Sequence, residues 1–321
     1  MVTTSASANS TAPSGIKRIL IAVDSSSVAA RAAAYIRYMT VPGVEVRIVS
    51  VAENPRVLVP LGSRTDAELQ TARAELLRDA STAVERVKEI FVQVNVNVDV
   101  RVLELSRTGG DTANALIDAA SEWQADLLVV GARQHHGLLR WVEGKVSEFV
   151  TTRAACSILV VPANYEAEIH AFPRRILFAL DGSRFSLDAL RFGLLFAAPE
   201  SSLRAVYVID RAVRLTDFVP IHVLEDSFKE EGENTLAAAA GVFANLPNHV
   251  ESGLVKTKVS NDDVPHAIVR EARRWHADLL VVGTHGRRGL ARWLIGSVAE
   301  RTARITHTPL LLARPRPNSS S

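Results

Sequence analysis

Short apolar runs rich in Val, Ile and Leu alternate along this chain with longer stretches in which apolar residues recur every three or four positions. Runs of the first kind are typical of buried strands, and the longer spacing is typical of helices that pack one face on a core. Strands alternating with crossover helices form a parallel sheet, so the pattern predicts an α/β fold. The clearest helix is predicted over residues 66–91. Strands are predicted near residues 19–23, 46–51, 96–103, 127–130 and 158–161, and again near 176–180, 203–208, 254–259, 279–282 and 310–313.

The second half of the pattern repeats the first. The heptapeptide "ADLLVVG" occurs at residues 125–131 and again, identically, at residues 277–283, and "RILIAVDSS" near the start parallels "RILFALDGS" at residues 175–183. The chain therefore contains two tandem copies of one domain. The fold class predicted is α/β, with two doubly wound five-stranded parallel-sheet domains, Rossmann-like, in tandem.

The repeat also predicts the domain boundaries. The first domain is predicted over residues 16–162 and the second over residues 174–314, with a linker at residues 163–173. Residues 1–15 are predicted to be a disordered tail, and residues 315–321 are predicted to be a second polar tail. A length of 321 residues is about that of two ordinary domains.

Composition excludes some settings and partners. The formal net charge of +2 gives no argument for a nucleic-acid partner. The single cysteine, Cys156, cannot form an internal disulfide, so we expect a reducing, intracellular setting. At this position we expect a small buried core residue rather than a reactive thiol. The N-terminal stretch lacks the pattern of a secretory signal, and no apolar run approaches the roughly 20 residues that span a bilayer. The sequence thus predicts a cytoplasmic protein with no membrane partner.

A glycine-rich stretch, "GTHGRRGLARWLIGSVAE", follows the fourth predicted strand of the second copy. Gly283 and Gly286 lie three positions apart, and Gly296 and Ser297 follow after nine residues, where a helix is predicted to start near Ser297. Glycines allow a backbone to approach a ligand closely, and the N–H groups at a helix start favour phosphate. Ligands of doubly wound sheets bind beyond the carboxyl ends of the strands. The stretch therefore predicts an anion cradle built from backbone.

These residues resemble the ATP-binding pattern of the universal stress proteins in their tandem form: Gly, two residues, Gly, nine residues, Gly-Ser/Thr. The resemblance implies a stress-response protein that binds ATP, with or without Mg²⁺. It also implies that Asp181 lies near the ribose and adenine, that the Val208 backbone meets the adenine edge, and that the glycine pattern surrounds the ribose and phosphates. Arg287 either reaches the γ-phosphate or belongs to a solvated loop or partner surface. A turn at the strand-end glycine and a helix cap at the aspartate are the alternative interpretations.

The first copy keeps only part of this pattern. Gly131 and Gly144 remain, as does Asp24 after the first strand, but Gln134 replaces the second glycine and Lys145 replaces the serine. A left-handed backbone at position 134 would cost a non-glycine residue roughly 1–2 kcal/mol. Lys145 could neutralise a phosphate as a point charge, but a cation opposes the dipole at a helix start. We therefore predict an empty or altered site in the first domain.

Three classes of function remain open. The first is an ATP-binding regulatory module, with one ATP in the second domain and at most slow hydrolysis, whose bound state is recognised by regulatory proteins of unknown identity. The second is an ATP-using phosphotransferase or ATPase, and the third is a ligand-free interaction scaffold. The first is favoured because the sequence offers no general base, no Mg²⁺-binding acidic pair and no identifiable arginine finger. No catalytic residue and no metal ligand is therefore predicted.

The last strand of each copy, "SILVV" and "PLLLA", is apolar throughout. An unprotected apolar edge invites uncontrolled pairing, and in the resembling family such edges pair two domains across a twofold axis. We expect the two domains to pair within one chain, and association of two chains into a homodimer is a further expectation.

Overall fold

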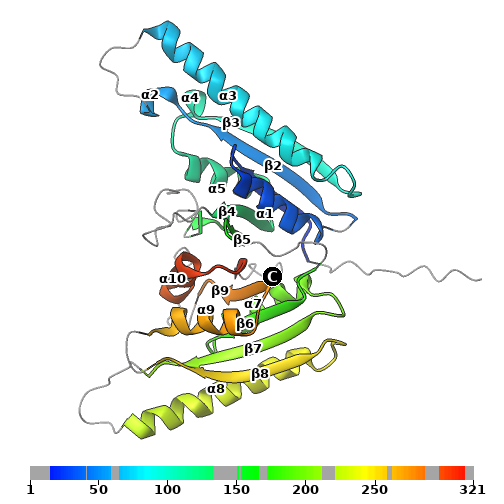
Figure 1. Ribbon diagram of the computed structural model, residues 1–321, viewed down its shortest axis with the longest axis vertical. Coiled ribbons are helices and arrows are strands. Elements are labelled where there is room, and N and C mark those ends of the chain that lie inside the picture. Colours follow the sequence, from blue (N-terminus) through cyan, green and yellow to red (C-terminus); the bar gives the residue numbers. More distant parts are fainter. Residues whose placement is uncertain are drawn as a thin grey trace, which may run out of the picture.

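The computed structural model describes residues 15–40, 42–58, 65–132, 150–151, 153–165, 172–211, 221–258, 262–285 and 296–314. Its strands form a single ten-stranded sheet in the order β3-β2-β1-β4-β5-β10-β9-β6-β7-β8 (Figure 1). The strands of the first half are β1 (Arg18–Val23), β2 (Glu45–Ala52), β3 (Asn97–Glu104), β4 (Leu127–Ala132) and β5 (Ser157–Pro162). Those of the second half are β6 (Arg175–Leu180), β7 (Ser202–Ile209), β8 (Val250–Lys256), β9 (Leu279–Gly283) and β10 (Leu310–Ala313).

Each half is a five-stranded parallel sheet in which the order reverses beside the first strand. In the first half β1 pairs with β2 on one side and β4 on the other, and β6 pairs likewise with β7 and β9. The predicted tandem of doubly wound domains is confirmed. The strand order reverses between β1 and β4 and between β6 and β9. Sheets of this kind bind ligands beyond the carboxyl ends of the strands at such switch points.

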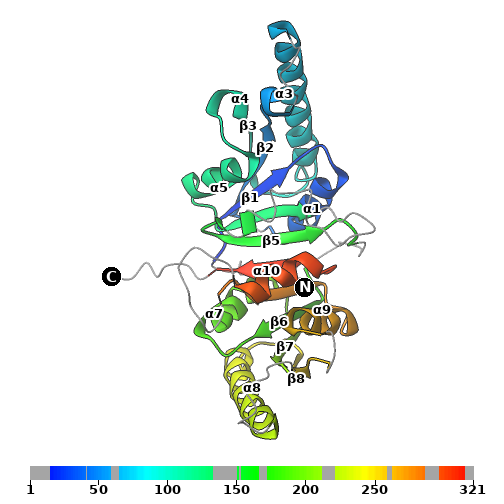
Figure 2. The same ribbon diagram turned by 90° about the vertical axis from the view of Figure 1, so that its left-hand side faces the viewer.

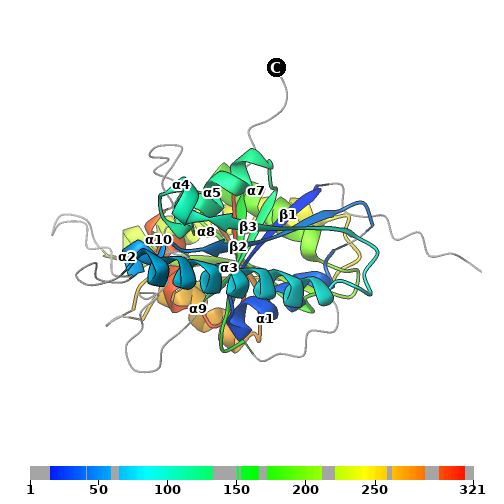
Figure 3. The same ribbon diagram turned by 90° about the horizontal axis from the view of Figure 1, so that it is seen from above.

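Helices cover both faces of the sheet (Figure 3). One buried cluster includes side chains of α1, α3, α7 and α8, and the other includes side chains of α5, α9 and α10. The helices of the first half are α1 (Ser27–Arg37), α2 (Pro55–Leu58), α3 (Asp66–Glu89), α4 (Leu105–Thr108) and α5 (Thr112–Glu122). Those of the second half are α7 (Arg184–Gly193), α8 (Ile221–Phe243), α9 (Val264–Arg274) and α10 (Ser297–Ile305), with a short 3-10 helix at Leu194–Phe196.

Local sequence explains where the clearest helix starts. Thr65 caps α3, because its side chain accepts the Glu68 N–H while the Glu68 carboxylate accepts the Thr65 N–H, a capping box. Ala80, Ala83 and Val87, which the periodicity places on one face, are buried. The helix predicted over residues 66–91 is confirmed with an end two residues earlier.

One strand prediction placed its boundary wrongly. The third strand of the second copy, predicted over residues 254–259, is β8 at Val250–Lys256. Its first four residues, "VESG", mix polar residues with a glycine, so the apolar signal begins only at Leu254. Their backbone is nevertheless paired with β7, as in Leu203↔Val250. Pairing with a neighbour therefore outweighs local composition at this end of the strand.

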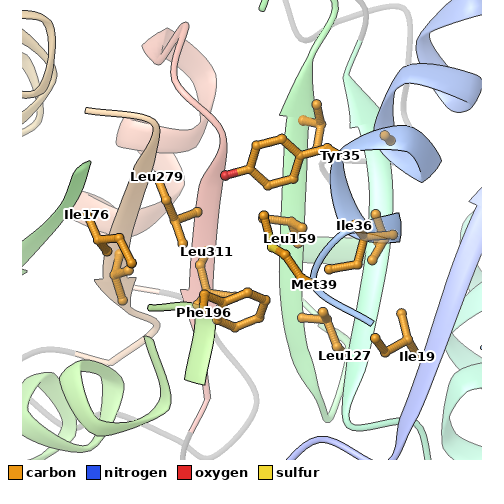
Figure 4. Close-up of a cluster of buried hydrophobic side chains, with 14 of the residues drawn as sticks. Ile19, Tyr35, Ile36, Met39, Leu127, Leu159, Ile176, Phe196, Leu279 and Leu311 are labelled. Carbon is orange, nitrogen blue, oxygen red and sulfur yellow. The ribbon is translucent and has the colours of Figure 1, made fainter. Parts of the chain in front are cut away.

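The two domains meet where β5 and β10 pair antiparallel, with Leu311 opposite Leu159. Both leucines are fully buried, and Figure 4 shows them facing each other within one apolar cluster. The Tyr35 hydroxyl of α1 donates to the Asp278 carbonyl of the second domain at 2.9 Å. Figure 2 shows α10 beside β5 at this seam, with α3 and α8 at opposite ends of the molecule. The predicted pairing of the domains within one chain is confirmed.

Candidate functional site

The residues predicted to bind the ligand come together at one edge of the second half-sheet. Asp181 follows β6 directly, and Gly283 is the last residue of β9. Ala179 of β6 is level with Val282 of β9, so the two strands end side by side at the switch point. Val208 lies next to the end of β7, on the other side of β6, where Tyr207 is level with Leu180. Asp181, Val208 and Gly283 therefore lie along one strand-end edge.

Asp181 organises the turn between β6 and α7. Its Oδ1 accepts hydrogen bonds from the Ser183 N–H at 3.0 Å and from the Ser183 Oγ at 2.6 Å. Ser183 in turn caps α7 by accepting the Ser186 N–H at 3.2 Å. Between them Gly182 has φ +83°, a left-handed conformation that glycine adopts without steric cost. The helix cap is therefore Ser183, and Asp181 positions that cap.

The start of α10 is bound to the end of β9. The Gly296 N–H donates to the Thr284 carbonyl at 2.7 Å, and the Thr284 N–H donates to the Ala313 carbonyl at 3.1 Å. Eleven residues lie between Thr284 and Gly296 in the sequence, but these bonds bring Gly296 back beside β9 and β10. The predicted helix start at Ser297 is confirmed.

No side chain caps α10, because its N-cap is Gly296. The first-turn N–H groups of a helix have no acceptor within the helix, so they favour an anion placed before them. By contrast, Thr65, Asp111, Ser183 and Asp263 cap α3, α5, α7 and α9 with their side chains. The helix start beside Asp181 is thus a donor site that the described side chains leave open.

Several predicted residues lie outside the described part of the chain. They are Gly286 and Arg287 in the second domain and Gln134, Gly144 and Lys145 in the first. Their roles stay predictions from the sequence.

The first domain repeats the aspartate turn. Asp24 follows β1, and its Oδ1 accepts the Ser26 N–H at 2.9 Å and a hydrogen bond from the Ser26 hydroxyl. Ser26 makes no side-chain cap bond to α1, in contrast to Ser183. The carboxylate arrangement is therefore present in both domains, whether or not a ligand is bound.

Gly131 of β4 has a packing role. A Cβ at this position would lie 2.8 Å from Val28 Cγ1 and 3.0 Å from the Val28 carbonyl oxygen in α1. A Cβ at Gly283 would lie no closer than 3.4 Å to any atom, an ordinary contact distance. The glycine at the end of β4 is needed for close helix packing, and the glycine at the end of β9 is not.

His285 packs on its neighbours. Its ring lies 5.6 Å from the Phe185 ring between centroids, and its Nδ1 is 3.0 Å from the Thr284 Oγ1. These contacts fit a role in shaping the strand end rather than proton transfer. Within the described residues, no group of three or more His, Cys, Asp or Glu side chains is placed to hold a metal ion. None of the described helices is long and apolar enough to cross a membrane.

Cys156 is half-buried rather than fully buried, and it packs against the cluster that includes α10. Burial raises the pKa of its thiol to about 11. The thiol is therefore neutral at pH 7 and a poor nucleophile, in line with a packing residue.

Sequence reasoning missed Arg314. It follows β10 directly and is only 7% exposed. The residue before it, Ala313, accepts the Thr284 N–H with its carbonyl. Arg314 was placed at the very end of the second domain, beside a polar tail, where a charged residue attracts no attention. Its one signal is position, because it comes two residues after Leu312, and side chains two positions apart in an extended chain point to the same face.

Comparisons with known proteins agree on one family. The model of the universal stress protein family matches residues 15–162 and again residues 173–314. A universal stress protein of Mycolicibacterium smegmatis is 27% identical over 255 residues, covering 74% of this chain and 78% of that protein. One of Methanocaldococcus jannaschii is 29% identical over 148 residues, covering 44% of this chain and 82% of that protein.

A solved structure shows the same fold over almost the whole chain. The crystal structure of a universal stress protein from Archaeoglobus fulgidus DSM 4304 matches with a TM-score of 0.62 at 17% identity, covering 94% of this chain and 97% of that chain. A universal stress protein solved in complex with cAMP matches with a TM-score of 0.31 at 20% identity, covering 46% of this chain and 98% of that chain.

Proposed function

This chain belongs to the universal stress protein family, whose domain it carries twice, and we propose that its second domain binds one ATP as a regulatory ligand. A stress-response role fits the family. In this proposal the bound state, rather than a fast reaction, is what regulatory proteins recognise, and hydrolysis is slow at most. The protein acts in the cytoplasm.

One observation carries the proposal: the uncapped start of α10 is bound to the strand end at the switch point, beside Asp181. A phosphate placed there accepts hydrogen bonds from the N–H groups of the first helical turn and from the Ser297 hydroxyl. Gly296 has φ −66° and ψ 146°, an extended backbone that any residue can adopt. A glycine is therefore not needed there to relieve backbone strain, and its lack of a side chain leaves space for a ligand. Gly283 supports the same view, because protein packing alone does not require a glycine there.

The other ligand contacts follow from the same edge. The Asp181 carboxylate faces the ribose, and the Val208 backbone, on the neighbouring strand, meets the adenine. Gly286 and Arg287 extend the cradle toward the phosphates, and any Mg²⁺ that accompanies ATP is coordinated by the phosphate oxygens rather than by a dedicated set of protein ligands.

Nucleotide extraction tests this proposal directly. The purified chain is heat-denatured, and the released small molecules are separated by ion-exchange chromatography against ATP, ADP, AMP and cAMP standards. Calorimetry on nucleotide-free protein is expected to give a stoichiometry near one ATP per chain. A stoichiometry of two, or no binding at all, would contradict the proposal.

Steady-state phosphate release distinguishes a binding module from an ATP-using enzyme. We expect turnover far below the typical 1–100 per second of kinases, with or without Mg²⁺. Release that rises to this range when a protein or small-molecule acceptor is added would favour a phosphotransferase instead.

A further inference from the structure

Within the described residues, a buried arginine without an ionic partner lies two hydrogen bonds from the start of α10. Arg314 is 7% exposed, and its Nε and Nη2 have no hydrogen-bond partner in that part of the chain. Its own backbone N–H donates to the Ser157 Oγ at 3.1 Å, which anchors the residue at the end of β10. Buried guanidinium groups are normally paired, because removing a charge from water without compensation is costly. An unpaired one therefore calls for an explanation.

No acidic group near Arg314 explains its burial. Burial lowers the pKa of its guanidinium, which is the reverse of what a close carboxylate would do. The ionisable neighbour of Arg314 is the Cys156 thiol, whose raised pKa keeps it neutral at pH 7. Glu300, the acidic residue in the first turn of α10, is paired with Arg304 at 2.6 Å. The described part of the chain thus offers Arg314 no anion.

The strand pattern sets the face on which this side chain lies. Leu310 and Leu312 belong to the buried cluster that includes Ala299 and Ala303 of α10, whereas Leu311 belongs to the cluster on the opposite face. Side chains two positions apart along an extended chain point to the same face. Arg314, two residues after Leu312, therefore lies on the face that α10 covers.

Hydrogen bonds fix its level along that face. Ala313 accepts the Thr284 N–H, and Thr284 accepts the Gly296 N–H at the N-cap of α10. Ala313 is also level with Gly283 in the pairing of β10 with β9. The guanidinium and the open helix start thus lie at the same edge and on the same face of the sheet.

We propose that Arg314 is a phosphate ligand of the nucleotide site, donating from Nε and Nη2 to the phosphate group that the start of α10 receives. This inference rests on the function proposed above. The Nε and Nη2 donors of arginine form a fork that matches two phosphate oxygens. The corresponding residue of the first domain is Pro162, which offers no donor. The second domain therefore carries a buried cation for phosphate that the first domain lacks.

Comparing ATP with adenosine isolates a phosphate contact. Calorimetry is performed on the full chain with each ligand, for the wild type and for Arg314→Gln. Loss of a charge-assisted pair is expected to weaken ATP binding about 10- to 100-fold, while adenosine binding changes less than about twofold. Arg314→Lys keeps the charge but not the fork, so it is expected to recover part of the ATP affinity.

Arg304→Gln is the matched control, since it removes a guanidinium from α10 that already has Glu300 as partner. It is expected to leave the ratio of ATP to adenosine affinity unchanged. Thermal melting of the nucleotide-free proteins checks the fold, and Arg314→Met provides a second uncharged, unbranched replacement if Arg314→Gln is unstable. Because Arg314→Gln and Arg314→Met remove a buried unpaired charge, we expect both variants to melt at or above the wild-type temperature without ATP.

The outcomes separate the two proposals. If the wild type binds neither ATP nor adenosine, the proposed function fails. If the wild type binds ATP but the Arg314 variants keep its affinity, or lose ATP and adenosine equally, the phosphate role of Arg314 is wrong and the proposed function stands.

Discussion

Gly131 and Gly283 occupy matching positions at the ends of β4 and β9, yet only the first is required by its own domain. A side chain at Gly131 would collide with Val28 of α1, whereas a side chain at Gly283 would make ordinary contacts. The same residue type, glycine, is thus present at equivalent positions of the two domains for two different physical reasons. A motif residue that survives in a degenerate copy is no evidence for a surviving ligand site, because packing alone can preserve it.

The two copies also differ in where they place positive charge. The first carries Lys145 at the position of Ser297 and Pro162 at the position of Arg314. The second has the neutral Ser297 at the first position of α10 and carries its cation at the end of the neighbouring strand. A cation at the end of the neighbouring strand complements an anion bound at the helix start, whereas a cation in the first turn itself opposes the helix dipole most strongly.

The largest expected effect is at the helix start. Gly296→Gln is expected to weaken ATP binding at least about 100-fold, because the side chain fills the space before the first-turn N–H groups. Its extended backbone tolerates any residue, so the melting temperature should change little. Calorimetry and thermal melting measure both. Gly144→Gln in the first domain is the matched control and should leave ATP affinity unchanged. Full affinity in Gly296→Gln would refute the site.

The two strand-end glycines test the comparison directly. Gly131→Ala is expected to cost about 1–3 kcal/mol of unfolding free energy, because Val28 and its backbone must shift. Gly283→Ala is expected to change stability by less than about 0.5 kcal/mol. Urea denaturation monitored by circular dichroism measures both variants. Equal costs at the two positions would show that packing also explains Gly283.

Restoring the pattern in the first domain should produce a smaller gain. Gln134→Gly combined with Lys145→Ser is expected to open a second ATP site, weaker than the first because Pro162 provides no cation there. Asp24 already forms the required turn. Calorimetry should then give a stoichiometry approaching two at high ATP concentration. A stoichiometry that stays at one would show that the defect lies elsewhere in the first domain.

The smallest effect concerns the seam. Tyr35 of α1 corresponds to Phe192 of α7, and only Tyr35 donates across to the second domain, at 2.9 Å to the Asp278 carbonyl. Tyr35→Phe makes the two copies alike and is expected to cost about 1 kcal/mol, since the Asp278 carbonyl loses the hydrogen bond from the Tyr35 hydroxyl. Urea denaturation of the full chain measures this cost, and Phe192→Tyr is the reciprocal control. An unchanged unfolding free energy in Tyr35→Phe would show that the bond adds nothing to the seam.

Local pattern was sufficient for much of this molecule. The identical "ADLLVVG" segments revealed the repeat, and ten short apolar runs located ten strands, because a buried parallel strand must be apolar on both faces. The glycine spacing placed the predicted site at the switch point, since the strand that precedes Gly283 pairs with the strand that precedes Asp181. The start of α10 at Ser297 was also read correctly from glycine followed by a helical pattern.

Only the tertiary structure decided what depends on neighbours distant in the sequence. The collision of a Cβ at Gly131 with Val28 joins residues about 100 positions apart, and no local period reports it. The start of β8 at Val250 is determined by pairing with β7 rather than by its own composition. Arg314 reads as the polar end of a strand, and its burial follows from the pairing of β10 with both β9 and β5. Periodicity determines which residues are buried within one element, and packing between elements determines which charges are buried with them.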